Sequence, residues 1–245
     1  MINLKTLSKS KVNILLLIGN LTLALLSLWF FSASNFDLQI QNNFFNFSEK
    51  KWLIDRSDPI KKLIFYQLPK IALGALILAV VVLCFFSFYK TKNKFFNKRY
   101  DILLIVIGLP LILLIAGNVK KITNIYCPNQ LEIFGGNKPY LKILEHYPQD
   151  FKQEKKGQCF PAGHAITGFC LYIFCFIFHK KIQQIFVFSL VTIYGWILGF
   201  YQILKGAHFI SDTLLAMLLC IFLAQIIAQI YRYKINKKFI NELSL

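Results

Sequence analysis

Charged side chains are scarce in this chain of 245 residues, because only 16% of them are Asp, Glu, Lys or Arg while 56% are hydrophobic. A soluble domain normally carries about 25% charged residues and shorter apolar runs, so the composition argues against a soluble protein. Little chain remains between the apolar runs, which excludes a separate soluble domain of ordinary size. We therefore expect one integral membrane domain over residues 1–245.

Acidic residues are the rarer charged class, with 11 Asp and Glu against 28 Lys and Arg, for a net charge of +17. Such an excess can indicate a nucleic-acid-binding protein, but no segment combines the basic and aromatic residues of a nucleic-acid platform. In a membrane protein, basic loops orient the chain and contact anionic lipid. We therefore expect the membrane, and no nucleic acid, as the partner; oligomeric state stays unknown at this stage.

Apolar runs of about 20 residues are abundant, and a bilayer core needs about that many apolar residues per helix. We therefore predict an all-α fold, a bundle of six transmembrane helices. The expected spans are residues 12–31, 71–89, 102–119, 162–178, 185–204 and 213–231.

Six spans place both chain termini on the same side of the membrane. The short loops on that side are denser in Lys and Arg, above all the segment KTKNKFFNKR at residues 90–99. Because basic residues concentrate in short cytoplasmic loops, we expect the termini in the cytoplasm. The loops 32–70, 120–161 and 205–212 would then face a periplasm or the cell exterior.

The outward loops hold the most unusual segments of the chain. The aromatic segment NNFFNFSEKKW (42–52) is expected at the level of the lipid headgroups. Three further segments, KKITNIYCP (120–128), CFPAGHA (159–165) and KGAHFISD (205–212), each adjoin the end of a predicted span. Since all three lie on the same face of the membrane, their side chains can converge on one pocket at the outer interface.

His208 and Asp212 form the first candidate pair, because ionisable groups beside a bilayer are costly and commonly functional. If the sixth helix begins near residue 207, a spacing of four residues puts both on one helix face. The carboxylate can then fix the imidazole tautomer and leave the other ring nitrogen with a lone pair for attack. A structural hydrogen bond that ties the fifth and sixth helices explains the pair equally well.

His164 follows Pro161, Ala162 and Gly163 at the predicted start of the fourth span. Free N–H groups at a helix start bind anions, and glycine lets the backbone come close to a ligand. A histidine there can donate a proton to a leaving oxygen. The alternative is an interfacial histidine that only faces water.

Lys120, Lys121 and Lys205 bring positive charge to the level of the two histidines. Cations at this position would attract an anionic group. Lysines near helix ends also extend to the membrane interface without binding anything, so both interpretations stay open.

The three segments together resemble the three-part signature of the type 2 phosphatidic acid phosphatase superfamily. That signature reads Lys-x6-Arg-Pro, then Pro-Ser-Gly-His, then Arg-x5-His-x3-Asp. In this chain its positions are occupied by Lys120, Cys127, Pro128, Pro161, Ala162, Gly163, His164, Gln202, His208 and Asp212. The order and the membrane face also agree, and the resemblance covers about residues 70–231. Cys-Pro in place of Arg-Pro is similar to a bacterial branch of the superfamily.

The resemblance implies a lipid phosphatase that needs no metal and no cofactor. His208 would attack phosphorus and form a phosphohistidine, Asp212 would orient it, and His164 would protonate the leaving alkoxide. The residues expected to bind the substrate are Lys120, Lys121, Asn124, Ala162, Gly163, Gln202 and Lys205. The active site would face the periplasm, at the outer interface of a bacterial inner membrane.

Three residues that cradle phosphate in the family are replaced here, since Cys127 and Gln202 stand for arginines and Ala162 for serine. The chain has three arginines in all, Arg56, Arg99 and Arg232. None lies near the motifs, so we expect Lys205 and Lys121 to supply the missing charge. A lysine binds phosphate as a point charge, without the bidentate geometry of arginine.

Cys127 and Cys159 are the two cysteines in outward loops, and each adjoins one of the motifs. An oxidising compartment favours a disulfide between them, which would tie the first motif to the second. Closing a loop of about 30 residues would stabilise the fold by about 3–4 kcal/mol. Two unpaired thiols are the alternative.

The expected substrate is a phosphate monoester or pyrophosphate of an outer-leaflet lipid. The many outward lysines favour lipid A or polyprenyl pyrophosphate, while phosphatidylglycerophosphate and phosphatidate also fit the family. A lipid phosphotransferase would use the same residues, and a non-catalytic membrane scaffold would explain the missing arginines. A metal site built from His164, His208 and Asp212 lacks a clear fourth ligand.

Overall fold

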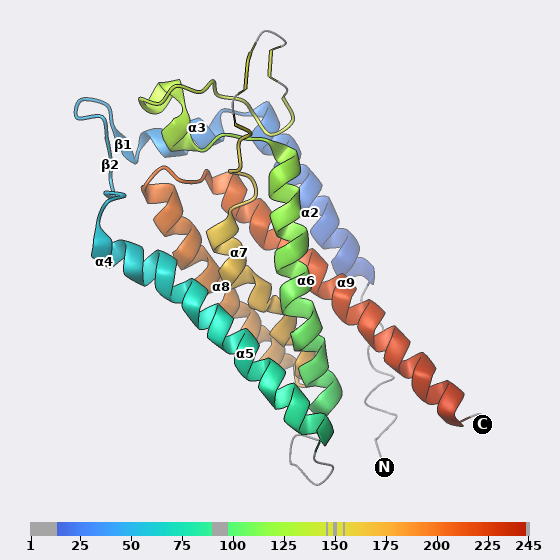
Figure 1. Ribbon diagram of the computed structural model, residues 1–245. Helices are drawn as coiled ribbons and strands as arrows, with labels where there is room; N and C mark the ends of the chain where they lie inside the picture. The colour runs from blue at the N-terminus through green and yellow to red at the C-terminus, as the bar shows by residue number, and fades with distance from the viewer. Residues whose placement is uncertain (1–13, 90–97, 146, 149–150, 154, 244–245) are drawn as a thin grey trace.

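Long helices dominate the computed structural model of the protein (Figure 1), which describes residues 14–89, 98–145, 147–148, 151–153 and 155–243. Its α-helices are α2 (Ile14–Ala33), α3 (Phe36–Asn42), α4 (Pro59–Lys62), α5 (Leu68–Tyr89), α6 (Arg99–Thr123), α7 (Gly163–Phe169), α8 (Lys181–Leu204) and α9 (Ile210–Leu243). The shorter elements are the π-helix η1 (Leu63–Gln67), the 3₁₀ helices η3 (Pro128–Gln130), η4 (Glu132–Phe134) and η5 (Cys170–Ile177), and the antiparallel strands β1 (Phe45–Asn46) and β2 (Lys51–Trp52).

Among the described residues, five helical segments are long and apolar enough to cross a membrane: α2, the continuous α4–η1–α5 segment, α6, α8 and α9. The remaining predicted span, 162–178, is a shorter apolar segment over Gly163–Ile177, in which α7 continues directly into the 3₁₀ helix η5. The all-α, multi-pass membrane bundle is therefore confirmed. Its six apolar segments are unequal, because the fourth is shorter and more tightly wound than an ordinary span.

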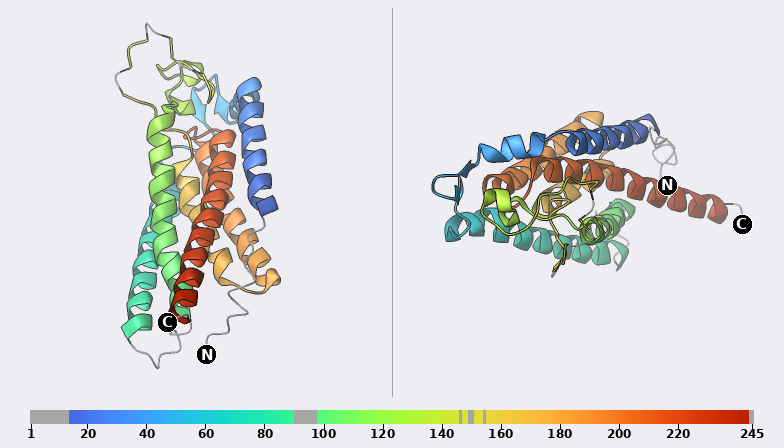
Figure 2. Two further views of the ribbon diagram at one scale, coloured as in Figure 1. Left: turned by 90° about the vertical axis from the view of Figure 1, so that its right-hand side faces the viewer. Right: turned by 90° about the horizontal axis from the view of Figure 1, so that it is seen from above.

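The short segment α7–η5 lies at the centre of the bundle, where α7 contacts α5, α6, α8 and α9 (Figure 2). Small residues permit this central position. A Cβ on Gly168 would lie 2.7 Å from the Cα of Gly195, so the backbones of α7 and α8 touch. Close approach through small residues is the usual packing of membrane helices, whereas the outer surfaces of α2 and α5 keep exposed leucines such as Leu15 and Leu78 for lipid.

The segments predicted to be outward loops form a folded cap at one end of the bundle (Figure 1). At this end α6 and α8 end and α7 and α9 begin. Phe45 is buried there, and its ring centroid lies 4.8 Å from that of Trp52 and 5.4 Å from that of Phe134. The ring of Phe45 packs on protein because the 120–161 loop supplies an aromatic partner, whereas Phe47 of the same segment stays exposed.

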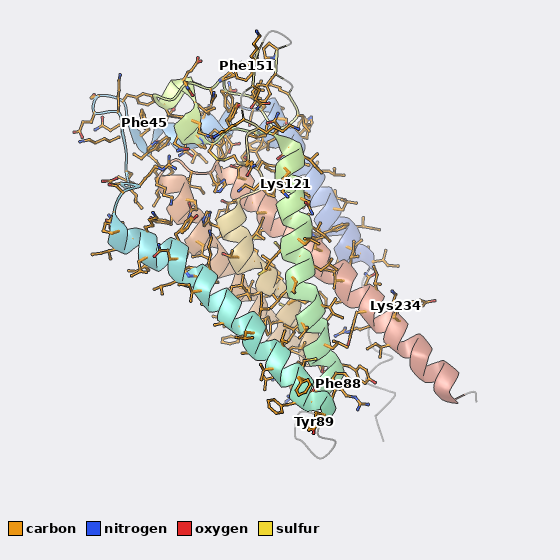
Figure 3. All side chains as sticks on the ribbon, in the orientation of Figure 1. Phe45, Phe88, Tyr89, Lys121, Phe151 and Lys234 are labelled. Atoms are coloured by element: carbon orange, nitrogen blue, oxygen red, sulfur yellow. A yellow bond between two sulfur atoms is a disulfide. The ribbon has the colours of Figure 1, made fainter. Side chains whose placement is uncertain are left out.

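Aromatic residues mark both ends of the bundle (Figure 3). Phe45 and Phe151 lie at the capped end, while Phe88 and Tyr89 lie at the opposite end of α5. Exposed aromatic rings at the end of a span suit a membrane–water interface, and Tyr89 is largely exposed. The basic stretch 90–97, on which the predicted cytoplasmic side depends, lies outside the described residues.

Candidate active site

His164 and His208 lie side by side at the capped end of the bundle, with ring centroids 6.3 Å apart. His164 belongs to the first turn of α7, and His208 belongs to the turn between α8 and α9. Lys120, in the last turn of α6, also reaches this point, since a Cβ on Gly163 would lie 3.1 Å from its Nζ. The structure therefore brings the three motif segments together.

The contact between His208 and Asp212 arises from a helix start rather than from a shared helix face. Helix α9 begins at Ile210, so the condition of a helix start near residue 207 is not met and His208 precedes the helix. Asp212 Oδ2 accepts a hydrogen bond from the backbone N–H of Phe209 at 2.9 Å and lies 3.4 Å from His208 Nδ1. The carboxylate pairs a free N–H of the first turn, which holds the preceding turn and its imidazole in place.

The neighbours of His208 Nδ1 define its tautomer. Besides Asp212 Oδ2, this nitrogen lies 3.2 Å from Sγ of Cys159, which is disulfide-bonded to Cys127 and carries no hydrogen. Because both neighbours can only accept, Nδ1 carries the proton and Nε2 carries the lone pair. Burial, and then the charges of Lys120 and Lys205, hold the pKa of His208 well below its usual range. The imidazole is thus neutral at neutral pH, as a nucleophile must be.

His164 is positioned by the backbone that precedes it. The N–H of Ala162 donates a hydrogen bond to the backbone oxygen of Asp212 at 3.1 Å, which joins the start of α7 to the start of α9. Both ring nitrogens of His164 are buried and have no hydrogen-bond partner in the described part of the chain. Leaving buried polar atoms unpaired costs about 1–3 kcal/mol each, so this ring is suited to a ligand that supplies the partners.

The Tyr66 ring contacts the His164 ring, and two lysines lie beside Tyr66. The ring centroid of Tyr66 lies 4.4 Å from that of His164. Lys70 Nζ lies 3.9 Å, and Lys205 Nζ 5.6 Å, from the centroid of Tyr66. Lys205 is only 8% exposed, and its Nζ also lies 4.5 Å from the ring of Tyr201. Aromatic faces hold these cations beside the histidines without neutralising them.

Positive charge at this site is not limited to the motif lysines. Burial, and then repulsion from Arg56, Lys62 and Lys70, lowers the pKa of Lys205 to about 8. The expectation that no arginine lies near the motifs is therefore wrong. Arg56 is distant from the motifs in the sequence but close to Lys205 in the fold. Arg56 approaches because the chain returns from the β1–β2 hairpin to α4 beside the end of α8.

The predicted substrate-binding residues divide into two groups. Gly163 and Ala162 lie at the start of α7, and Gln202 is buried with an Nε2 that has no partner among the described residues. Lys121 is exposed, since neighbouring positions on a helix point in different directions. Asn124 uses its amide inside the loop, where its Oδ1 accepts from the N–H of Gly157 at 2.8 Å.

Asp37, Tyr66 and Lys70 were missed by the sequence-based prediction. Lys70 directly precedes the second predicted span on the outward side, which was the one available signal. Asp37 is 6% exposed on α3, and its pKa is raised to about 7 by burial despite hydrogen bonds from Ser211. Nothing local in the sequence distinguishes Asp37 or Tyr66, because they reach the site only through packing.

The backbone at the turn that carries His208 accepts hydrogen bonds from distant segments. Gln41 Nε2 donates to the oxygen of Ile203 at 2.8 Å, and the N–H of Ile54 donates to the oxygen of Leu204 at 3.3 Å. On the other side, the N–H of Asn129 donates to the oxygen of Gly206 at 2.9 Å. His208, the candidate nucleophile, therefore lies in a turn that is fixed by hydrogen bonds on both sides.

The disulfide between Cys127 and Cys159 joins the first motif to the second, with Cα atoms 5.0 Å apart. Their sulfurs and a nitrogen of His208 lie within 4.8 Å of one another, which resembles a metal site in ligand type. Cysteine binds a metal as a thiolate, and sulfurs bonded to each other are not thiolates, so this pair does not supply metal ligands. The other four cysteines are free thiols, Cys84, Cys170, Cys175 and Cys220.

Comparison with known proteins agrees with this arrangement. The family model of the PAP2 superfamily matches residues 101–236. A similar solved structure is that of the first transmembrane PAP2 type phosphatidylglycerolphosphate phosphatase from Bacillus subtilis, with 15% sequence identity and a TM-score of 0.53. The alignment covers 86% of this chain and 93% of that one, and no curated protein matches. The protein belongs to the PAP2 superfamily and has the fold of a transmembrane member of it.

Proposed function

We propose that this protein hydrolyses a phosphate monoester or pyrophosphate of an outer-leaflet lipid through a phosphohistidine intermediate. The single observation that carries the proposal is the 6.3 Å separation of the His164 and His208 rings. In-line phosphoryl transfer places the attacking and leaving atoms on opposite sides of one phosphorus, so one phosphoryl group can lie between these two rings.

In the first step, the lone pair on His208 Nε2 attacks phosphorus while the bond from phosphorus to the lipid oxygen breaks. A proton on His164 passes to the leaving alkoxide, which departs as a neutral alcohol. The phosphorylated imidazole is positively charged, and its Nδ1–H faces the carboxylate of Asp212 at 3.4 Å. Asp212 thereby stabilises the charge that develops during attack.

In the second step, water attacks the phosphohistidine. His164, now neutral, accepts a proton from the attacking water as the phosphorus–nitrogen bond breaks and returns its electron pair to His208 Nε2. Inorganic phosphate leaves, and the protonated His164 is ready for the next substrate. Every proton is accounted for by the two histidines and water, so the cycle closes without a further group.

Lysines replace the missing arginines in binding the phosphate. Lys120 and Lys205 both act electrostatically on His208, and Lys70 lies beside the Tyr66 ring that contacts His164. Cations that are partly withdrawn from water interact strongly with an anion, which compensates for the loss of bidentate contacts. We place Lys70 in this set together with the predicted Lys120 and Lys205, and leave Lys121 out.

We place the active site on the periplasmic face of a bacterial inner membrane, with both termini in the cytoplasm, because the short basic loops favour that orientation. Lipid A and polyprenyl pyrophosphate are the preferred substrates for so basic a site. Phosphatidylglycerophosphate is the alternative, since it is the substrate that the name of the similar solved structure indicates. Transfer of the phosphoryl group to an acceptor lipid would use the same two histidines.

The test compares phosphate release from a panel of lipid phosphates by the wild-type protein, His208→Ala and His179→Ala. His179 is an exposed histidine that follows η5, outside the proposed site, and serves as the matched control. We expect release that survives excess chelator, vanishes in His208→Ala and persists in His179→Ala. Loss on chelation would indicate a metal mechanism instead, and absence of release from every lipid would indicate a scaffold.

A further inference from the structure

A basic cavity lies beside the proposed active site, across the turn that carries His208. Its volume is about 630 Å³, which is within the range of small-molecule sites. Four of its lining residues are cations: Arg56, Lys138, Lys155 and Lys156. None of the lining residues that the structure gives is acidic, so the cavity is suited to an anion.

The walls of this cavity are held by the folded cap rather than by free loops. The hydroxyl of Tyr126 donates a hydrogen bond to the backbone oxygen of Lys155 at 2.7 Å. The N–H of Lys138 donates to the oxygen of Gln130 at 2.9 Å, and its Nζ lies 5.8 Å from the centroid of the Tyr126 ring. The backbone at Lys138 and Lys155 is thus held by hydrogen bonds, and both residues line the same cavity as Arg56 and Lys156.

The cavity adjoins the catalytic histidines without containing them. Ala207 lines it and directly precedes His208, while Cys127 lines it and is bonded to Cys159, whose Sγ lies 3.2 Å from His208 Nδ1. Neither histidine of the proposed site is among the lining residues. An anion in the cavity is therefore on the Nδ1 side of the turn, and it is not the phosphoryl group that reacts at Nε2.

We propose that this cavity binds a second, unreacted phosphate of the lipid headgroup whose first phosphate is cleaved at His208. The inference rests on the proposed phosphatase function. The two phosphorus atoms of a pyrophosphate share an oxygen, so both would lie at the histidines and leave the cavity empty. A phosphate in the cavity must instead be joined to the reacting one by a spacer such as a sugar. The substrate class is a glycolipid with phosphates at two separate positions, as in lipid A.

The experiment uses two disaccharide lipids that differ only in whether the second phosphate is present. The cavity variant carries Lys138→Gln, Lys155→Gln and Lys156→Gln. The control variant carries Lys50→Gln, Lys51→Gln and Lys152→Gln, which removes the same charge from exposed positions outside the cavity. Arg56 stays unchanged, because it also acts on Lys205.

The cavity variant should raise KM for the lipid with two phosphates about tenfold and leave kcat unchanged, as expected for three lost surface ion pairs. Its KM for the lipid with one phosphate should stay within about twofold of the wild-type value, and the control variant should resemble wild type on both. An equal change on both lipids, or the same change in the control variant, would overturn the inference. The third measurement is inhibition of phosphate release by added inorganic phosphate. Strong inhibition of the wild-type protein but not of the cavity variant would indicate that the cavity is a site for free phosphate instead.

Failure of the phosphatase proposal would look different. Release by His208→Ala, or no release by wild type, contradicts the reaction but leaves the cavity open to a binding measurement. Binding of the lipid with two phosphates is then compared between His208→Ala and the same protein with the three cavity substitutions, each in nanodiscs of neutral lipid. About tenfold weaker binding in the latter supports the cavity, and equal binding overturns it.

Discussion

The carboxylate of Asp37 accepts two hydrogen bonds from Ser211, one from the hydroxyl at 2.5 Å and one from the backbone N–H at 3.1 Å. Asp37 belongs to α3, outside the matched residues 101–236, whereas Ser211 adjoins Asp212 in the first turn of α9. The pair therefore connects the amino-terminal part of the chain to the turn that positions His208.

Asp37 should make the stability of the protein depend on pH. Burial raises its pKa from 3.8 to about 7, so the stability it contributes is complete below about 3.8 and is lost as pH rises through about 7. Asp37→Asn is neutral throughout, and its amide oxygen can still accept from the Ser211 N–H. We expect the melting temperature of wild type to fall between about pH 4 and pH 8 more than that of Asp37→Asn. Parallel melting curves would contradict a buried, titrating carboxyl group, and Asp37→Ala should lose about 1–3 kcal/mol at any pH.

The contribution of His164 to the rate of phosphate release should be larger for a poorer leaving group. His164→Ala removes the proton donor, so release from a lipid alkyl phosphate should fall about 10²- to 10⁴-fold. An aryl phosphate leaves without protonation and should lose far less. The ratio of the two rates in wild type and variant measures this difference. Equal losses on both substrates would assign His164 to binding rather than to proton transfer.

Lys205 should impose an upper pH limit on substrate capture. Its pKa is lowered to about 8, so it is charged below that pH and neutral above it. We expect kcat/KM, which reports the free enzyme, to fall as pH rises through about 8. Lys205→Arg keeps its charge and should extend the plateau upward. A falling limb at the same pH in Lys205→Arg would show that another group titrates.

The disulfide should contribute to stability. Replacing Cys127 and Cys159 with serine opens a loop with a sequence separation of 32 residues, and should cost about 3–4 kcal/mol of unfolding free energy. The partly buried free thiol Cys175 provides the control, since Cys175→Ser breaks no bond. Thiols of the unfolded protein are counted before and after reduction. A count that reduction leaves unchanged would exclude the bond.

Gly206 should be difficult to replace, because it combines a positive φ with crowded surroundings. Its φ is +69°, and a Cβ there would lie 2.2 Å from Cε2 of Trp52. Gly206→Ala should therefore displace the turn before His208 and lower kcat as well as stability. Gly135 also has a positive φ, +81°, but has open space around it, so Gly135→Ala should cost only about 1 kcal/mol of backbone strain. Similar effects of the two substitutions would mean that the contact with Trp52 is unimportant.

The sequence by itself determined the membrane class, the helical bundle and the three segments that carry His164, His208 and Lys120. Each of these is local information, because bilayer thickness dictates the length of an apolar run and the residues within each motif are close in number. The same locality explains why the pair Cys127 and Cys159 could be suggested, since each adjoins a motif at the same membrane face.

Only the tertiary structure decided which side chains join the site and which do not. The hairpin and the α4–η1–α5 segment pack against the end of α8, and this contact brings Arg56, Tyr66 and Lys70 to the site. No local pattern in the sequence encodes such a contact. Asn124 does not belong to the site, because its amide forms hydrogen bonds within the loop. Helix α9 begins at Ile210 because the Asp212 carboxylate pairs the N–H of Phe209. Contacts between residues distant in the chain depend on how whole helices pack, and that is decided by the sum of many burials and hydrogen bonds.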